Sequence, residues 1–130
     1  MPALKTYIVE DSAVIRENLV ATLEEMTPLR VVGTATDEDD AARWLADPAN
    51  GCELAIIDIS LRQGSGLGVL KALRELQRDC KRIVLSNYAT PALRRHCLAF
   101  GADAVFDKSS EIDALIGWCQ RLAADGGTEA

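Results

Sequence analysis

The feature that most constrains the fold of this chain is a fivefold alternation of short β-forming runs with longer amphipathic stretches. Strands are expected at 4–9, 29–35, 54–59, 82–86 and 102–106. Alternation of this kind, with right-handed crossovers, predicts a three-layer α/β fold in which helices cover both faces of a parallel sheet. The first, third and fourth runs are almost wholly apolar, which is typical of strands buried on both faces.

Helix start and stop signals follow the predicted strands. Ser12, Asp37 and Thr90 stand where N-caps are expected. Pro91 suits the first turn of the fourth helix and Gly101 its C-terminal cap. Apolar residues at helical spacing are expected to face the core: Ile15, Leu19, Leu23 and Met26; Ala41, Trp44 and Leu45; Leu70, Leu73 and Leu76, within a helix at 67–78; and Ile112, Leu115, Ile116, Cys119 and Leu122.

The length of 130 residues suits one domain with its own core, and we expect that domain over 1–124 with a short polar tail over 125–130. No apolar stretch approaches the roughly 20 residues of a membrane span, and no signal peptide is visible at the start. A cytoplasmic protein is therefore expected. The net charge of −6 argues against direct binding of nucleic acid over the whole surface.

Two further features leave alternatives open. The four cysteines, Cys52, Cys80, Cys97 and Cys119, form no CxxC motif, so a zinc site is not expected. We interpret them as reduced thiols that pack in the core, with redox sensing as the alternative. A basic segment at 71–95 is either a solvated helix face or a docking patch for an acidic partner.

Polar residues stand where the predicted strands end. Glu10 and Asp11 follow the first strand, Asp58 lies at the end of the third, Ser86 ends the fourth, and Lys108 follows the fifth. The carboxyl ends of parallel strands meet at one edge of a sheet, so these residues are expected to share a crevice. Three carboxylates there would repel one another unless a cation such as Mg²⁺ relieves the repulsion. Removing one carboxylate is accordingly expected to stabilise the metal-free fold.

This set also indicates a chemistry. A carboxylate can attack phosphorus and form an aspartyl phosphate. A lysine and a hydroxyl nearby can hold the phosphoryl oxygens.

In their order and separations, these residues resemble the receiver domain of bacterial two-component response regulators, of the stand-alone, chemotaxis-response-regulator-like kind. The resemblance spans roughly 3–124 and includes the strings YIVEDS, AIIDISLRQGSGLGVL, IVLSNYAT and GADAVFDKS. It implies a flavodoxin-like fold, a doubly wound five-stranded parallel sheet with strand order 2-1-3-4-5.

The resemblance implies a role for each strand-end residue. Asp58 would be the phosphoacceptor, Lys108 would pair with it, and Ser86 would turn toward the phosphoryl group. The ligands of Mg²⁺ or Mn²⁺ would be Glu10, Asp11, Asp58 and the backbone carbonyl of Ser60.

Three positions depart from the family pattern. Arg62 and Ser109 stand where proline is common. Val105 stands where the family has its switch aromatic, with Phe106 next to it, which puts the usual aromatic readout in doubt.

Two residues are expected to flank the phosphoryl group. Ser60 lies two residues after Asp58, and Tyr88 lies two residues after Ser86. Tyr88 is expected to gate the access of water and to report the movement of Ser86. The alternative is a tyrosine that lies in solvent.

The implied function is that of a regulatory protein rather than an enzyme. It would accept a phosphoryl group from a histidine kinase or a histidine phosphotransfer protein and then change its binding to a downstream protein. Because few residues follow the last helix, no output module is expected. A partner or a second copy is expected on the fourth helix, fifth strand and fifth helix, with Arg94, Arg95 and Trp118 as anchors. Trp118 alternatively flanks the core.

Three other functions fit the sequence less well. A small Mg²⁺-dependent phosphohydrolase would use Asp58 as nucleophile, but such enzymes often carry a second Asp where this chain has Ser60. A receiver-like scaffold that acts without phosphorylation would be favoured by loss of the acid pair, Asp58 or Lys108, and none is lost. A flavodoxin-type flavin site needs a Ser/Thr-rich loop where EDSAVIRE stands.

Overall fold

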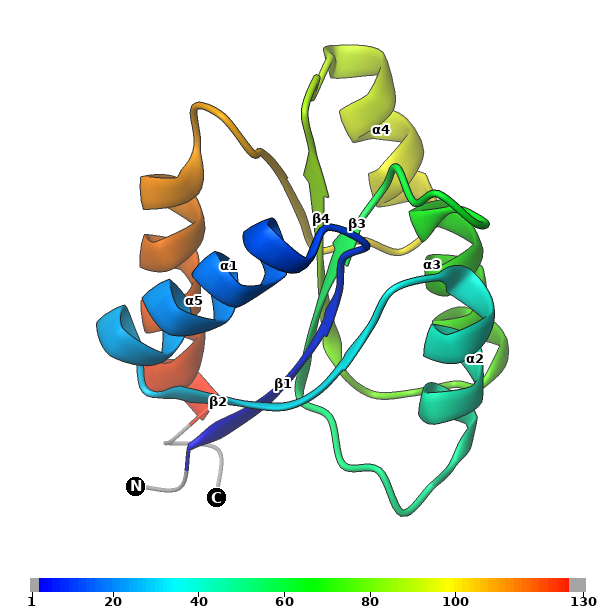
Figure 1. Cartoon of the computed structure of the whole chain (residues 1–130), viewed down its shortest axis with the longest axis horizontal. Helices are drawn as coiled ribbons and strands as arrows, with labels where there is room; N and C mark the ends of the chain where they lie inside the picture. The colour runs from blue at the N-terminus through cyan, green and yellow to red at the C-terminus, as the bar shows by residue number, and fades with distance from the viewer. Residues whose placement is uncertain (1–2, 127–130) are drawn as a thin grey trace.

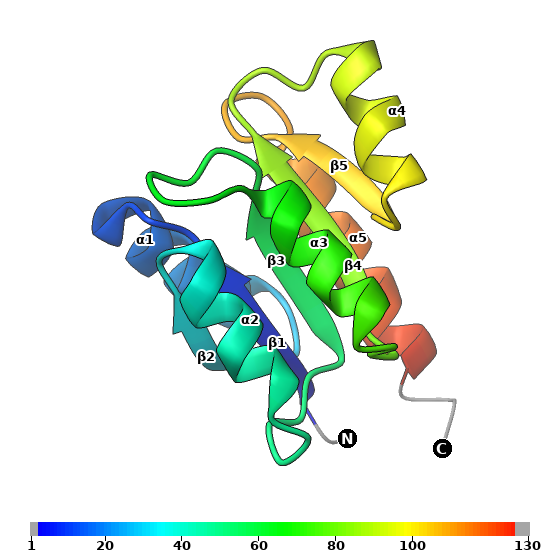
Figure 2. The same cartoon turned by 90° about the vertical axis from the view of Figure 1, so that its right-hand side faces the viewer.

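The sheet is built outward from β3 (Leu54–Asp58), whose five residues are all buried. β1 (Leu4–Val9) and β4 (Lys81–Ser86) pair with it on either side, and β2 (Leu29–Ala35) and β5 (Ala104–Asp107) form the edges. A computed structural model describes residues 3–126 of the chain. Over these residues the five strands run parallel in the order β2-β1-β3-β4-β5 (Figure 2), which confirms the predicted topology.

Helices cover both faces of the sheet (Figure 1). α1 (Ala13–Met26) and α5 (Ile112–Gly126) lie on one face. α2 (Glu38–Ala46), α3 (Gly66–Glu75) and α4 (Pro91–Ala99) lie on the other. Each face has its own apolar core, one including Leu23 and Leu115 and the other including Leu45 and Leu73. The predicted three-layer, doubly wound flavodoxin-like fold is confirmed.

The predicted helix caps are present. The side chains of Ser12, Asp37 and Thr90 accept hydrogen bonds from backbone N–H groups in the first turns of α1, α2 and α4, at 3.3, 2.8 and 3.2 Å. Gly101 follows α4 with a φ of +104°, a left-handed conformation that favours glycine. These caps place the start of each helix beside the end of the preceding strand.

Several predicted details are wrong. Ile15, Met26 and Leu76 were expected to face the core, but they are 40%, 51% and 41% exposed. Ile15 lies in the first turn of α1, Met26 is its last residue, and Leu76 caps α3, so periodicity overstates their burial.

Some element boundaries also differ from prediction. α3 ends at Glu75 rather than near 78, because Gln77 adopts a positive φ of 55°. β3 ends at Asp58 rather than at residue 59. β5 begins at Ala104 rather than at residue 102, since the Ala102 N–H closes the end of α4 by donating to Cys97 O.

The C-terminal boundary also differs from prediction. α5 continues to Gly126, two residues into the expected tail, and residues 127–130 lie outside the described part of the chain. Among residues 3–126, no helix has the length and apolar character to span a membrane.

Candidate functional site

The register of the sheet brings the predicted site residues together. Val9 pairs with Ile57 and Asp58 pairs with Leu85, so Glu10, which follows Val9, lies at the level of Asp58. One strand further, Ser86 ends β4, and its carbonyl oxygen accepts the Lys108 N–H at 2.8 Å. The carboxyl ends of β1, β3, β4 and β5 therefore form one crevice, as expected for a sheet of this order.

Lys108 links two buried carboxylates in this crevice. Its Nζ donates to Glu10 Oε1 at 2.6 Å and to Asp58 Oδ2 at 2.7 Å. The three side chains are nearly buried, with Lys108 11%, Glu10 2% and Asp58 4% exposed. Charge-assisted hydrogen bonds between buried groups are strong, and removing one partner destabilises the fold because the other charge is left buried and unpaired. The pair of Lys108 with Asp58 was predicted, but its equal contact with Glu10 was not.

The protonation of these groups is set by burial and pairing. Burial raises the pKa of Glu10, although hydrogen bonds from Lys108 and from the Ser12 N–H oppose it. Burial by itself would lower the pKa of Lys108, but its bonds to Asp58 and Glu10 outweigh burial and raise that pKa. Lys108 therefore stays a cation at neutral pH and compensates the charge beside it.

Backbone groups fix the two carboxylates from the other side. Asp58 Oδ1 accepts the Ser60 N–H at 3.0 Å, and Glu10 Oε2 accepts the Ser12 N–H at 3.0 Å. Arg16 Nη1 donates to the carbonyl oxygen of Glu10 at 2.9 Å. Asp58 is thus held at both oxygens, by Lys108 and by the first turn of the loop after β3.

Asp11 is compensated by the loop that follows β3. Its Oδ2 accepts the Arg62 N–H at 2.8 Å, and the Arg62 guanidinium Nε lies 3.9 Å away. Burial opposes the shift, but the hydrogen bond from the Arg62 backbone and the charge of Arg62 keep the pKa of Asp11 below its usual value. Because proline has no N–H, the family's usual residue at 62 would not make this bond.

The carboxylates therefore do not simply repel one another. Glu10 and Asp58 share the Lys108 cation, and Asp11 is held by Arg62. The expectation that removing a carboxylate would stabilise the metal-free fold stays a prediction, and the hydrogen bonds that each carboxylate accepts in the folded state oppose it.

Three carboxylate oxygens in the crevice suit a hard cation. One from each of Glu10, Asp11 and Asp58 lies within 4.8 Å of the others. A purely oxygen donor set of this kind fits Mg²⁺ or Mn²⁺, which bind few carboxylates and keep several waters.

The predicted switch residues lie at the edge of the crevice. Ser86 is buried, and its Oγ accepts the Tyr88 N–H at 3.2 Å. The Tyr88 side chain is 82% exposed and does not cover the crevice in this structure. A role for Tyr88 as a gate therefore stays a prediction about the phosphorylated state.

At the β5 end of the site, the two residues that depart from the family pattern are Val105 and Ser109. Val105 is buried in the core under α3 and α4, and Phe106 packs against the opposite core. The Ser109 N–H and hydroxyl both donate to Asp107 Oδ1, at 2.9 and 2.6 Å. The hydroxyl bond and the N–H bond lower the pKa of Asp107 to about 2. A proline at 109 would remove both donors.

Arg94 has a structural position that sequence reasoning missed. Its Nε donates to Ala89 O and its Nη1 to Val105 O, both at 2.9 Å, and its Nη2 pairs with Glu111 at 2.5 Å. It therefore ties the β4–α4 loop to β5 and the start of α5 and is not a free anchor. No local sequence signal marks these contacts, because two of the three partners are backbone carbonyls.

The other two predicted interface anchors differ from each other. Arg95 is exposed on α4. Trp118 is partly buried and packs against the core under α1 and α5, which favours the core-flanking alternative.

Replacing Arg94 by alanine is expected to lower the free energy of unfolding by about 1–2 kcal/mol, because two carbonyls and Glu111 lose a shared donor. This range allows for the partial exposure of the side chain, which weakens the ion pair. Denaturant unfolding measures the loss. Arg95→Ala, at the exposed neighbouring position, is the matched control and should change stability by no more than about 0.5 kcal/mol. Equal losses in both variants would contradict the assignment.

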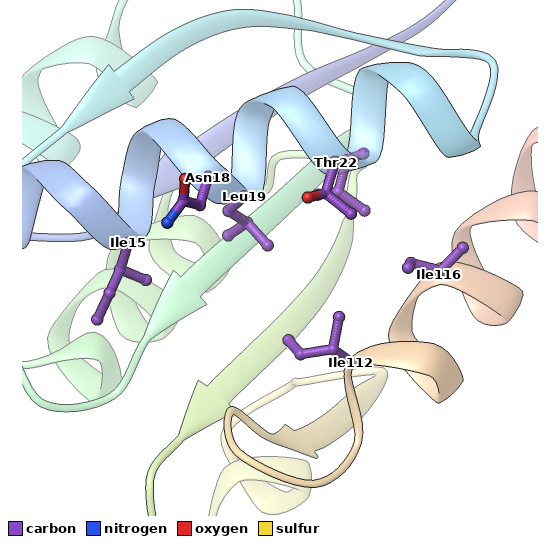
Figure 3. A pocket seen from close by; sticks show the side chains of 7 residues that line it. Ile15, Asn18, Leu19, Thr22, Ile112 and Ile116 are labelled. Carbon is purple, nitrogen blue, oxygen red and sulfur yellow. The ribbon is translucent and has the colours of Figure 1, made fainter.

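An apolar pocket lies between α1 and α5 (Figure 3), two helices that cover the face of the sheet opposite α4 (Figure 1). Its lining residues include Ile15 and Leu19 from α1 and Ile112 and Ile116 from α5. A second pocket, lined by Ile15, Ile112 and Lys108 among others, connects this surface with the Lys108 side of the crevice. The exposure of Ile15, which the sequence pattern had placed in the core, leaves this surface open.

Comparisons with known proteins match this geometry. A sequence model of the response regulator receiver domain matches residues 6–119. Response regulator UvrY of Escherichia coli O157:H7 is 27% identical over 110 residues, which cover 82% of this chain and 48% of UvrY. Transcriptional regulatory protein UhpA of Salmonella typhimurium is 29% identical over 119 residues, which cover 92% of this chain and 58% of UhpA. The chain spans about half the length of the curated relatives it matches.

Solved structures share the fold. The receiver domain of Francisella response regulator 1452 has a TM-score of 0.82 at 23% identity, covering 95% of this chain and 98% of that one. A Burkholderia pseudomallei response regulator with a phosphorylated aspartic acid has a TM-score of 0.76 at 24% identity, covering 97% of this chain and 72% of that one. With the sheet order, the buried carboxylates and the family match over most of the chain, the conclusion is that this chain belongs to the response regulator receiver domain family.

Proposed function

We propose that this receiver accepts a phosphoryl group on Asp58 from a histidine kinase or a histidine phosphotransfer protein, with Mg²⁺, and thereby switches its binding to a downstream protein. The observation that carries the proposal is the position of Asp58. It ends the central strand, nearly buried, with Lys108 on one carboxylate oxygen and the Ser60 N–H on the other.

The transfer uses groups that the crevice already positions. A carboxylate oxygen of Asp58 forms the new bond to phosphorus while the bond from phosphorus to the donor imidazole breaks, and the imidazole leaves with the electron pair. Lys108 then exchanges a carboxylate oxygen for a phosphoryl oxygen, and Ser86 offers its hydroxyl from β4. A cation held by Glu10, Asp11 and Asp58 would supply positive charge to the phosphoryl oxygens.

The change would be transmitted from Ser86 along the β4–α4 loop. The phosphoryl group adds a charge of about −2 beside Ser86 and Lys108. Movement of Ser86 displaces the loop whose Ala89 carbonyl is held by Arg94. Because Arg94 also holds Val105 O and Glu111, that movement reaches the α4–β5–α5 face without a switch aromatic at 105.

The donor is expected to approach over the apolar surface between α1 and α5. Val14 is 68% exposed and Ile15 40% exposed, next to the opening toward Lys108. Exposed apolar side chains beside a reactive crevice suit the surface of a partner protein. A homodimer through the α4–β5–α5 face and a cytoplasmic location stay predictions.

Replacing Asp11 by asparagine is expected to weaken Mg²⁺ binding at least about tenfold, since one of three clustered carboxylates loses its charge. Titration calorimetry with MgCl₂ measures the affinity. The intact protein can also be labelled by a small acyl phosphate at subsaturating Mg²⁺ and its mass measured. The labelled fraction should decrease as the Mg²⁺ affinity decreases.

Asp37→Asn is the matched control for this variant. Asp37 lines the same pocket as Asp11 but lies outside the carboxylate cluster, and asparagine can still cap α2. Unchanged Mg²⁺ affinity in Asp11→Asn, or an equal loss in Asp37→Asn, would contradict the proposed metal site.

A further inference from the structure

Two cysteines that take no part in the phosphoryl site meet at the opposite end of the central strands. Cys52 lies just before β3 and Cys80 immediately before β4. Leu54 pairs with Lys81, and the Lys81 N–H donates to Glu53 O at 3.0 Å, so the two approach segments run side by side. The two thiols are hydrogen-bonded to each other, and both side chains are only partly buried.

The Cys52 side chain is fixed by its surroundings. Its Sγ lies 3.4 Å from the Leu54 carbonyl oxygen, and it packs with Cys80 against the core under α2 and α3. The hydrogen bond with Cys80, together with burial, raises the pKa of Cys52. Cys52 is therefore the thiol of the pair that keeps its proton.

Positive charge surrounds Cys80. The Arg82 guanidinium lies beside the Cys80 thiol, and its Nε is buried with no hydrogen-bond partner among the described residues. Arg82 Nη2 is anchored on Arg78 O at 2.8 Å, and Arg78 Nη2 on Asn50 O at 2.5 Å. These carbonyl anchors hold two guanidinium groups beside one sulfur. Thiolates formed in such surroundings are the reactive ones.

The electrostatics of the pair agree with this geometry. The hydrogen bond from Cys52 lowers the pKa of Cys80 to about 7; burial opposes it, and Arg82 and Arg78 reinforce it. The other groups that face the pair are Tyr7, on β1, and the Leu54 backbone. By contrast, burial raises the pKa of Cys97, and it raises that of Cys119 to about 12. Both are buried core thiols.

We propose that Cys52 and Cys80 form an oxidisable thiol pair that closes to an intramolecular disulfide in the presence of hydrogen peroxide. The Cys80 thiolate attacks one peroxide oxygen, the O–O bond breaks, and hydroxide leaves, so that Cys80 becomes a sulfenic acid. The Cys52 sulfur, as it loses its proton, attacks the Cys80 sulfur. The S–S bond forms, the S–O bond breaks, and water leaves. Two thiols and one peroxide thus give one disulfide and two waters.

The disulfide would join the starts of the two strands that carry Asp58 and Ser86 at their other ends. This redox site does not depend on the proposed phosphotransfer, since it uses none of the crevice residues and needs neither Mg²⁺ nor a phosphodonor. Reduction by a dithiol would reverse it.

The test is oxidation of the full, reduced chain by a modest excess of hydrogen peroxide, followed by alkylation of the remaining thiols and peptide mapping. The expected result is a loss of two of the four free thiols and a peptide that links Cys52 to Cys80. Without peroxide, the rate at which iodoacetamide alkylates Cys80 should rise with pH and reach half of its maximum near pH 7. At pH 7 it should be at least about tenfold faster than that of Cys97 or Cys119, because far more of Cys80 is thiolate.

Variants separate the two steps. In Cys52→Ser, the sulfenic acid on Cys80 should accumulate and be trapped by dimedone, and no disulfide should form. In Cys97→Ala and Cys119→Ala, the Cys52–Cys80 link should form as in the wild type. Four intact thiols after a peroxide treatment that fully oxidises a free dithiol would overturn the proposal. So would a link through Cys97 or Cys119, or between two chains; the wild-type map decides this even if a variant fails to fold.

Discussion

Replacing Asp58 by asparagine is expected to abolish acceptance of a phosphoryl group. Asparagine keeps the shape of the side chain but removes the anionic oxygens, so no nucleophile of comparable strength remains at the end of β3. Incubation with a small acyl phosphate and Mg²⁺, followed by the mass of the intact protein, should show the gain of one phosphoryl group in the wild type and none in the variant. This is the largest effect that the site predicts.

Asp113→Asn is the matched control, because Asp113 is an exposed carboxylate in the first turn of α5, near the same end of the sheet. It should be labelled as the wild type is. Labelling that persists in Asp58→Asn would refute the assignment, and peptide mapping of the labelled chain would identify the true acceptor. Hydroxylamine, which cleaves acyl phosphates, should remove the label from the wild type.

Replacing Lys108 by methionine is expected to lower the free energy of unfolding of the metal-free protein by about 3–5 kcal/mol. Methionine has a similar length but no charge, so the buried carboxylates of Glu10 and Asp58 lose the cation that they share. Urea unfolding in the presence of a chelator measures the loss. Saturating Mg²⁺ should restore part of the stability, because ligand bound to the folded state adds free energy by mass action.

Lys71→Met is the control, since Lys71 is exposed on α3, and its effect should stay within about 0.5 kcal/mol. In an Asp58→Asn background the cost of Lys108→Met should be smaller, because one of the two carboxylates left without a partner has been removed. Equal costs in the two backgrounds would show that Lys108 and Asp58 do not stabilise each other.

Much of the fold and of the candidate site was predictable because the signals are local. Alternating apolar runs placed the strands to within a few residues, and Ser12, Asp37 and Thr90 marked helix starts. Because the strands of a βα sheet all point the same way, a polar residue at a strand end must lie at one edge. That rule alone brought Asp58 to the same crevice as Glu10.

The failures also have a local cause. Periodicity describes which face of a helix a residue occupies, but not whether that turn still lies over the sheet. Ile15 and Met26 share a face with Leu23, yet they lie near the two ends of α1 and are exposed. The family pattern likewise indicates that proline is replaced at 62 and 109, but it does not predict the contacts of Arg62 and Ser109. Those contacts depend on the direction of the two N–H groups in the folded chain.

The sequence by itself therefore determined the class of fold, the order of the elements and the residues that gather at the carboxyl edge of the sheet. Only the tertiary structure decided which side chains pair. Lys108 meets Glu10 across 98 residues of chain, Arg62 meets Asp11 across 51, and Cys80 meets Cys52 through the pairing of β3 with β4. The physical reason is that helix and strand preferences act between neighbours in the chain. Pairing of distant side chains depends instead on strand register, burial and rotamer, which exist only once the sheet has formed.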